Sequence, residues 1–146
     1  MNEDGVFVLE VAARPIGGLC ARALRFVGSS GCRLSLEDLI LQHAIGTPID
    51  QYCLEGTASG VMMVPIPRRG IYRRVENVED ALTLPGVEEI RITAKPDQTL
   101  IPLPEGASYL GFIFVRAETA AQAEQTLRLA HGKLRVVIDR ELRVKS

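Results

Sequence analysis

The sequence has few of the residues that build metal or disulfide sites. Its three cysteines, Cys20, Cys32 and Cys53, are odd in number and have no Cys-x-x-Cys spacing. This pattern argues against a disulfide framework and against a structural zinc site, so we expect reduced thiols in a cytoplasmic protein. The two histidines, His43 and His131, are far apart in the sequence and form no ligand motif.

Long apolar runs and an excess of charge of one sign are also missing. No segment approaches the ~20 apolar residues that a membrane span requires, and residues 1–4 are acidic, unlike a signal peptide. The formal net charge is -1, which gives no general field for nucleic acid or anionic membranes. The composition, 47% hydrophobic and 24% charged, is typical of a soluble globular protein of one domain or two small ones.

Nucleotide-binding loops are missing as well. The sequence has no Walker motif and no Gly-rich loop that precedes a lysine. Its lysines, Lys95, Lys133 and Lys145, all lie in the C-terminal part of the chain. We therefore expect that the isolated chain does not hydrolyse ATP.

The most informative segment that is present runs from Val6 to Gly18. Val6 to Val11 is apolar apart from Glu10, and its composition favours a strand, which Pro15 would end. Glu10 and Arg14 would then lie side by side at the end of the strand, over a Gly17-Gly18 turn that permits close backbone approach. A carboxylate beside a guanidinium suits a metal-bound phosphate. The alternative is a buried strand with a capping salt bridge.

This segment resembles the last metal-binding strand of the ATP-grasp ligases, whose pattern reads roughly Glu-x-Asn-x-Arg and is followed by glycines. The resemblance implies that Glu10 bridges two Mg²⁺ ions and that Arg14 is catalytic, close to the phosphates or the acyl-phosphate. It also implies a cofactor-binding turn at Gly17 and Gly18. Ala12 stands where the family usually has Asn.

The resemblance extends over most of the chain. Ser35 to Gly46 looks like the helix that follows in these enzymes, and residues from Ser59 on are similar to the C-terminal domain of the L-amino-acid ligase and carnosine-synthase-like branch. The chain is thus similar to the C-terminal portion of a carboxylate–amine ligase. ATP and Mg²⁺ are cofactors implied by the resemblance alone, and we expect the isolated chain to hold neither. The alternative is a stand-alone small-molecule-binding or assembly module.

The pattern along the chain predicts an α+β protein with two units. The resemblance implies that residues 1–58 are the end of an ATP-grasp domain. The pattern gives this unit one strand, a helix at Leu19–Val27 and a second helix that Ser35 caps, with Asp38 as its partner, and that ends at Gly46. Residues 59–146 follow the order strand, helix, strand, strand, helix, strand, which predicts a ferredoxin-like split β-α-β sandwich. Thr119 would cap the second of these helices, with Gln122 as its partner, and Ala123, Leu127 and Ala130 would form the inner stripe of that helix.

Two features bear on binding and assembly. The run Arg68-Arg69-Gly70-Ile71-Tyr72-Arg73-Arg74 could bind phosphate or carboxylate. It could instead be a solvated hairpin or loop whose charges pair with Glu76, Glu79 and Asp80. Asp4-Gly5 is a hairpin signal whose first strand would lie before Met1, so the strand at Val6 would have an unpaired edge. We therefore expect a homodimer, or a complex with a separate nucleotide-binding chain, that buries the N-terminal third.

Overall fold

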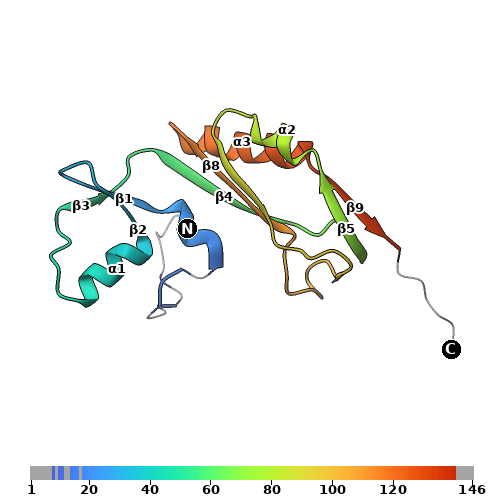
Figure 1. Ribbon diagram of the computed structural model, residues 1–146, viewed down its shortest axis with the longest axis horizontal. Coiled ribbons are helices and arrows are strands. Elements are labelled where there is room, and N and C mark those ends of the chain that lie inside the picture. The colour runs from blue at the N-terminus through green and yellow to red at the C-terminus, as the bar shows by residue number, and fades with distance from the viewer. Residues whose placement is uncertain (1–7, 9, 12–13, 17, 141–146) are drawn as a thin grey trace.

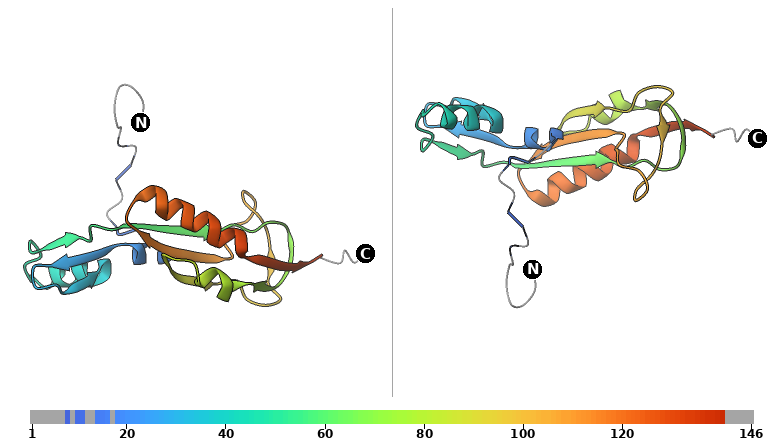
Figure 2. Two further views of the ribbon diagram at one scale, coloured as in Figure 1. Left: turned by 90° about the horizontal axis from the view of Figure 1, so that it is seen from above. Right: turned by 90° about the horizontal axis from the view of Figure 1, so that it is seen from below.

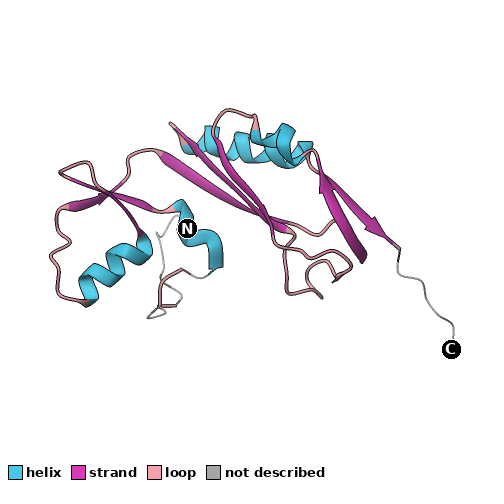
Figure 3. Ribbon diagram, in the orientation of Figure 1, coloured by secondary structure: helices cyan, strands magenta, loops and turns pink. Residues whose placement is uncertain are grey.

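The computed structural model describes residues 8, 10–11, 14–16 and 18–140. A small N-terminal sheet with one helix lies at one end of an elongated molecule, and two further sheets with two helices occupy the other end (Figure 1). Figure 3 shows how short most of these elements are. Among the described residues, no helix combines the length and the apolar character that crossing a membrane demands.

The N-terminal sheet is antiparallel, with the order β2-β1-β3. It consists of β1 (Arg25–Gly28), β2 (Arg33–Ser35) and β3 (Tyr52–Leu54), and the 3-10 helix η1 (Gly18–Ala23) precedes it.

The helix predicted over Leu19–Val27 is therefore wrong in its second half. Phe26 and Val27 favour a strand, and the turn at Gly28–Gly31 folds β2 back so that Phe26 pairs with Leu34. In so short a segment, the apolar spacing of a helix and that of a strand are hard to separate.

The helix predicted from Ser35 is confirmed as α1 (Leu36–Ala44). The Ser35 hydroxyl accepts a hydrogen bond from the Asp38 backbone N–H at 3.1 Å, and the Asp38 carboxylate accepts one from the Ser35 backbone N–H at 3.1 Å. This is the predicted capping box. The Ser35 hydroxyl and then its backbone N–H, by donating to the carboxylate, lower the pKa of Asp38.

The central sheet carries most of the core. It has the antiparallel order β4-β8-β6, from β4 (Ala58–Val64), β8 (Gly111–Ala117) and β6 (Val87–Ile92). The helices α3 (Ala120–Lys133) and α2 (Val78–Leu82) contact each other, and α3 lies across β4 and β8 (Figure 2). A Cβ at Gly60 would be 2.9 Å from Leu127 Cδ1, so the glycine permits the close approach of α3.

Strand alternation gives the central sheet a second, less covered face. Val115 lies beside Gly60 on the α3 face, and Phe114, one residue earlier, therefore faces the other way. On that side η1 contacts β4 and β8, and the guanidinium of Arg22 lies 5.6 Å from the centre of the Phe114 ring. Phe114 is thus one of the contacts between η1 and the central sheet.

A third sheet has the order β7-β5-β9, from β7 (Thr99–Leu100), β5 (Gly70–Glu76) and β9 (Arg135–Asp139). The chain is an α+β protein, as predicted. The ferredoxin-like arrangement of residues 59–146 is not confirmed, because the described strands of this region form two sheets in place of one.

Strand β5 occupies much of the arginine-rich run, for which the sequence predicts either an anion site or a solvated hairpin or loop. Arg73 pairs with Asp97 and, at 2.7 Å, with Asp139, while Arg74 pairs with Glu76 at 2.5 Å. The hydrogen bond from Arg73 to Asp139 raises the pKa of Arg73. The charges of Arg73 and Arg74 are thus balanced within the described chain, partly by acids far away in the sequence.

Candidate functional site

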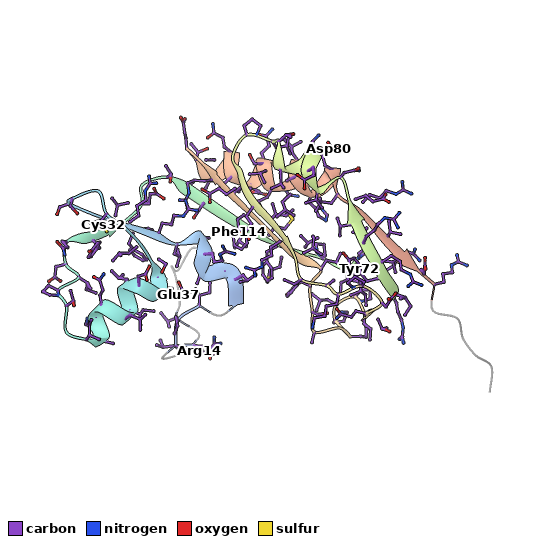
Figure 4. All side chains as sticks on the ribbon, in the orientation of Figure 1. Arg14, Cys32, Glu37, Tyr72, Asp80 and Phe114 are labelled. Atoms are coloured by element: carbon purple, nitrogen blue, oxygen red, sulfur yellow. The ribbon has the colours of Figure 1, made fainter. Side chains whose placement is uncertain are left out.

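The residues predicted for the metal and phosphate site lie at the start of the described chain. Glu10 and Arg14 are exposed, lie outside any helix or strand, and form no ion pair with another described residue. Figure 4 shows Arg14 apart from the central sheet, which carries Phe114. Gly18 begins η1, whereas Gly17 and most of the predicted strand from Val6 lie outside the described residues.

A cleft of about 580 Å³ lies between η1, β1, β2 and the start of α1. It is lined by Arg22, Leu24, Arg25, Arg33, Leu34, Ser35 and Glu37. Its volume suits a small-molecule site. Neither Glu10 nor Arg14 lines it, so among the described residues the predicted site and the cleft are different places.

Two of the three arginines that line the cleft, Arg22 and Arg25, are held by glutamates of β6. Arg25 binds Glu88 through two hydrogen bonds, Nη1 to Oε1 at 3.0 Å and Nη2 to Oε2 at 2.8 Å. Arg22 Nη1 donates to Glu89 Oε1 at 3.0 Å. Two parallel bonds from a guanidinium fix its plane as well as its position. The arginines are therefore oriented before any ligand arrives.

A bulge in β6 makes this pairing possible. The register between β6 and β8 shifts between Val87 and Glu89, so Glu88 and Glu89 are presented differently from the residues of a regular strand. In the sequence, Glu88 is the residue that breaks the alternation of the predicted strand. That interruption was the available signal for these two carboxylates, which sequence reasoning missed.

Arg116 of β8 lies at the centre of the same charged network. Its Nη1 is 2.9 Å from Glu55 Oε2, and its Nε donates to Glu88 Oε1 at 3.1 Å. Arg33 approaches Glu55 Oε1 at 3.2 Å from the opposite side. The side chains of Arg116 and Glu55 are 15% and 13% exposed, so both charges are largely removed from water. Ion pairs from Arg33 through Glu55, Arg116 and Glu88 to Arg25 thus tie the N-terminal sheet to the central sheet.

No group of three or more histidine, cysteine, aspartate or glutamate side chains converges as a metal site within the described part of the chain. Cys20, Cys32 and Cys53 are free thiols. The described residues hence offer an oriented cluster of arginines and glutamates, which can bind charged groups by hydrogen bonding.

Comparison with known protein families gives one match over more than half of the chain. The family model of the L-amino acid ligase C-terminal domain 2 matches residues 62–139. The chain belongs to this family. The resemblance to the C-terminal part of an ATP-grasp ligase is thereby confirmed, and the matched range contains Glu88 and Arg116 but neither Glu10 nor Arg14.

Solved structures agree with this family at the level of the fold. The chain is similar to the L-amino acid ligase from Bacillus licheniformis, with a TM-score of 0.63 and 16% identity over 73% of this chain and 27% of that one. It is also similar to the phosphoribosylglycinamide synthetase from Anaerococcus prevotii, with a TM-score of 0.56 and 16% identity over 70% and 27%. The chain spans about a quarter of the length of these two structures. No curated protein matches it.

Proposed function

We propose that this chain is the C-terminal part of an ATP-grasp carboxylate–amine ligase that joins amino acids. The observation that carries the proposal is the family match over residues 62–139. The fold shared with the L-amino acid ligase from Bacillus licheniformis supports it. In such a reaction ATP phosphorylates a carboxylate, and an amine then attacks the acyl-phosphate with loss of phosphate.

In this proposal the segment before η1 completes the phosphate site of the ligase. Glu10 would contribute one carboxylate to Mg²⁺, and Arg14 would steady the transferred phosphoryl group. Gly17 and Gly18 would let the backbone approach the nucleotide. The exposure of Glu10 and Arg14 supports this role, because both side chains are free to meet groups supplied by another part of the enzyme.

The described residues of this chain do not by themselves fit Mg-ATP. Mg²⁺ requires near-octahedral oxygen ligands, and at Glu10 the described residues supply a single carboxylate with no cluster around it. In the sequence, no lysine close to Arg14 could serve as the phosphate-binding lysine of a nucleotide site, since the lysines are at positions 95, 133 and 145. The remaining ligands would therefore come from the nucleotide-binding part of the ligase.

The purified 146-residue chain is accordingly expected to show no micromolar binding of Mg-ATP. The reason is the incomplete set of ligands around Glu10 and Arg14. Isothermal titration calorimetry of the chain with ATP in excess Mg²⁺ checks this, and the Glu10→Gln variant is the matched control. Micromolar binding that Glu10→Gln abolishes would show that the chain assembles a nucleotide site on its own.

Exposed apolar side chains support a partner over the N-terminal sheet. Leu41, Ile45 and Leu54 are 63%, 79% and 59% exposed, and α1 has no buried residue. In the proposed ligase this surface would pack against the nucleotide-binding part, on the same or a separate chain. A homodimer would cover it by two-fold symmetry, the commonest closed arrangement.

The ferredoxin-like sandwich stays a proposal for residues 59–146. The antiparallel pairs β6–β8 and β5–β9 are those that such a sandwich contains, and these pairings support it. Such a sandwich also requires β5 to pair directly with β8, and these two strands lie in different sheets of the described chain. We propose that the prolines after β4 and the pairing of β4 with β8 keep β5 apart.

A small-molecule-binding module is the second candidate, and the position of the 580 Å³ cleft favours it. A binding module would place its pocket away from Glu10 and Arg14, as this cleft is. The two candidates differ in what Glu10 does. In the ligase, Glu10→Gln removes a metal ligand and stops ATP-dependent chemistry, whereas in a binding module it leaves ligand binding at Arg22 and Arg33 unchanged.

A further inference from the structure

A second cleft, of about 530 Å³, lies at the junction between the central sheet and the β7-β5-β9 sheet. It is lined by Pro65, Pro67, Arg68, His131, Gly132, Leu134, Arg135 and Val136. These residues come from the segment after β4, the end of α3 and the start of β9. None of them lines the cleft beside η1, so this is a separate place on the molecule.

Part of the wall of this cleft is apolar, because prolines follow the end of β4 and apolar residues lead into β9. Pro65 and Pro67 have no N–H to donate and end the ladder of β4, which leaves their rings on the surface. Opposite them, Leu134 and Val136 lead from α3 into β9, an edge strand of its sheet. Strand β4 is likewise an edge strand of the central sheet, so the cleft lies where the edges of the two sheets meet.

The charged side chains of the lining are all basic. They are Arg68 and Arg135, and no lining residue is acidic. Arg68 Nη2 donates to the Ile138 carbonyl oxygen, which orients the guanidinium. Arg68 pairs with no carboxylate among the described residues, so most of its N–H groups are available to a ligand.

Arg135 is held only weakly by its own partner. Its Nε is 3.6 Å from Glu76 Oε2, and its side chain is 76% exposed. Glu76 binds Arg74 more closely, with Arg74 Nε at 2.9 Å from Glu76 Oε1. An anion in the cleft would therefore compete with a single long and solvated contact for Arg135.

We propose that this cleft binds small carboxylates that carry an apolar group. The carboxylate bonds to the guanidinium groups of Arg68 and Arg135, which suit its planar, bidentate geometry. The apolar group packs against Pro65, Pro67 and Leu134. A volume of about 530 Å³ accommodates a ligand of the size of an amino-acid derivative. This site is independent of the ligase chemistry assigned to Glu10 and Arg14.

The test uses three probes on the full chain. N-acetyl-leucine has a carboxylate and an apolar side chain, N-acetyl-leucinamide has the side chain alone, and acetate has the charge alone. The backbone amide signals of Gly132, Leu134 and Val136 in two-dimensional NMR report on the cleft. We expect saturable shifts with N-acetyl-leucine, and binding about tenfold weaker or more with each of the other two probes.

Two variants separate the cleft from general surface charge. Arg68→Gln together with Arg135→Gln should weaken N-acetyl-leucine binding by about tenfold or more. Arg128→Gln should leave it unchanged, since Arg128 pairs with Glu124 and does not line the cleft. The single substitution Arg68→Gln is the second test should the double variant not fold.

Three results would overturn the proposal. The first is the absence of saturable shifts with N-acetyl-leucine, and the second is equal binding by the wild type and a folded variant without Arg68. The third is tighter binding of inorganic phosphate than of N-acetyl-leucine, because the cleft would then recognise charge without its apolar walls.

Discussion

Replacement of Arg116 by methionine is expected to lower the free energy of unfolding by about 3 kcal/mol, as removal of one member of a buried ion pair does. Arg116 is 15% exposed and lies against Glu55 and Glu88, which come from different parts of the chain. Methionine fills much of the same volume, but the two carboxylates lose their shared cation. Because Glu55 is only 13% exposed, water cannot replace that cation fully.

Urea unfolding of the wild type and Arg116→Met measures this effect. Arg128→Met is the matched control, because Arg128 and Glu124 form an exposed pair within α3 that is worth about 0.5 kcal/mol. Adding Glu55→Gln to Arg116→Met should recover part of the loss, because Glu55 would otherwise keep a largely buried charge that only the exposed Arg33 offsets. Equal midpoints for Arg116→Met and Arg128→Met would show that the network does not hold the two sheets together.

Truncation of Phe114 or Leu127 to alanine is expected to destabilise the chain by about 2–5 kcal/mol each. The two side chains lie on opposite faces of the central sheet, with Leu127 against Gly60 on the α3 face. They are 4% and 8% exposed. The Phe114→Ala substitution also removes the stacking on Phe112, whose ring centre is 6.2 Å away, and the contact of the ring with Arg22.

Thermal unfolding compares these variants with Leu129→Ala, which changes a leucine of α3 that is 55% exposed. The control should shift the midpoint little, whereas both core substitutions should lower it clearly. Phe114→Ala should additionally loosen η1, because Arg22 loses the ring beneath it. A midpoint that neither core substitution changes would show that the core is assigned to the wrong faces.

Local signals in the sequence predicted the elements whose ends are fixed by side chains. Ser35 with Asp38 marked α1, and Thr119 with Gln122 marked α3, where both capping boxes form. Ala123, Leu127 and Ala130 were expected on the inner stripe of α3 and are buried. These predictions held because a capping box and a helical stripe depend on neighbours three or four residues away.

The predictions that failed depended on distant partners. Arg25 was expected on a helix, but Glu88, far along the chain, holds it in a strand. Arg73 was expected in a solvated hairpin or loop, paired with Glu76, Glu79 or Asp80, yet its partners are Asp97 and Asp139 of β9. No local pattern reveals which strand will lie beside an arginine, so the network around Arg116 could not be predicted.

For the candidate ligase site, too, the sequence predicted some features and not others. The family was predictable from the segment around Glu10 and Arg14 and from the pattern after Ser59, and the match over residues 62–139 confirms it. The roles of Glu10, Arg14, Gly17 and Gly18 stay predictions, because they depend on groups that the described residues do not supply. The arginine-lined cleft beside η1 follows from a hairpin that the sequence did not predict.

Amino-acid-dependent ADP formation tests the proposed ligase most directly. The protein is purified through a tag on this chain from the cells that make it, so that any nucleotide-binding part remains attached. We predict that pairs of amino acids stimulate ADP formation from Mg-ATP and that Glu10→Gln lowers this rate by about a hundredfold, as loss of a metal ligand would. ADP formation that does not depend on amino acids, or that Glu10→Gln leaves unchanged, would contradict the proposal.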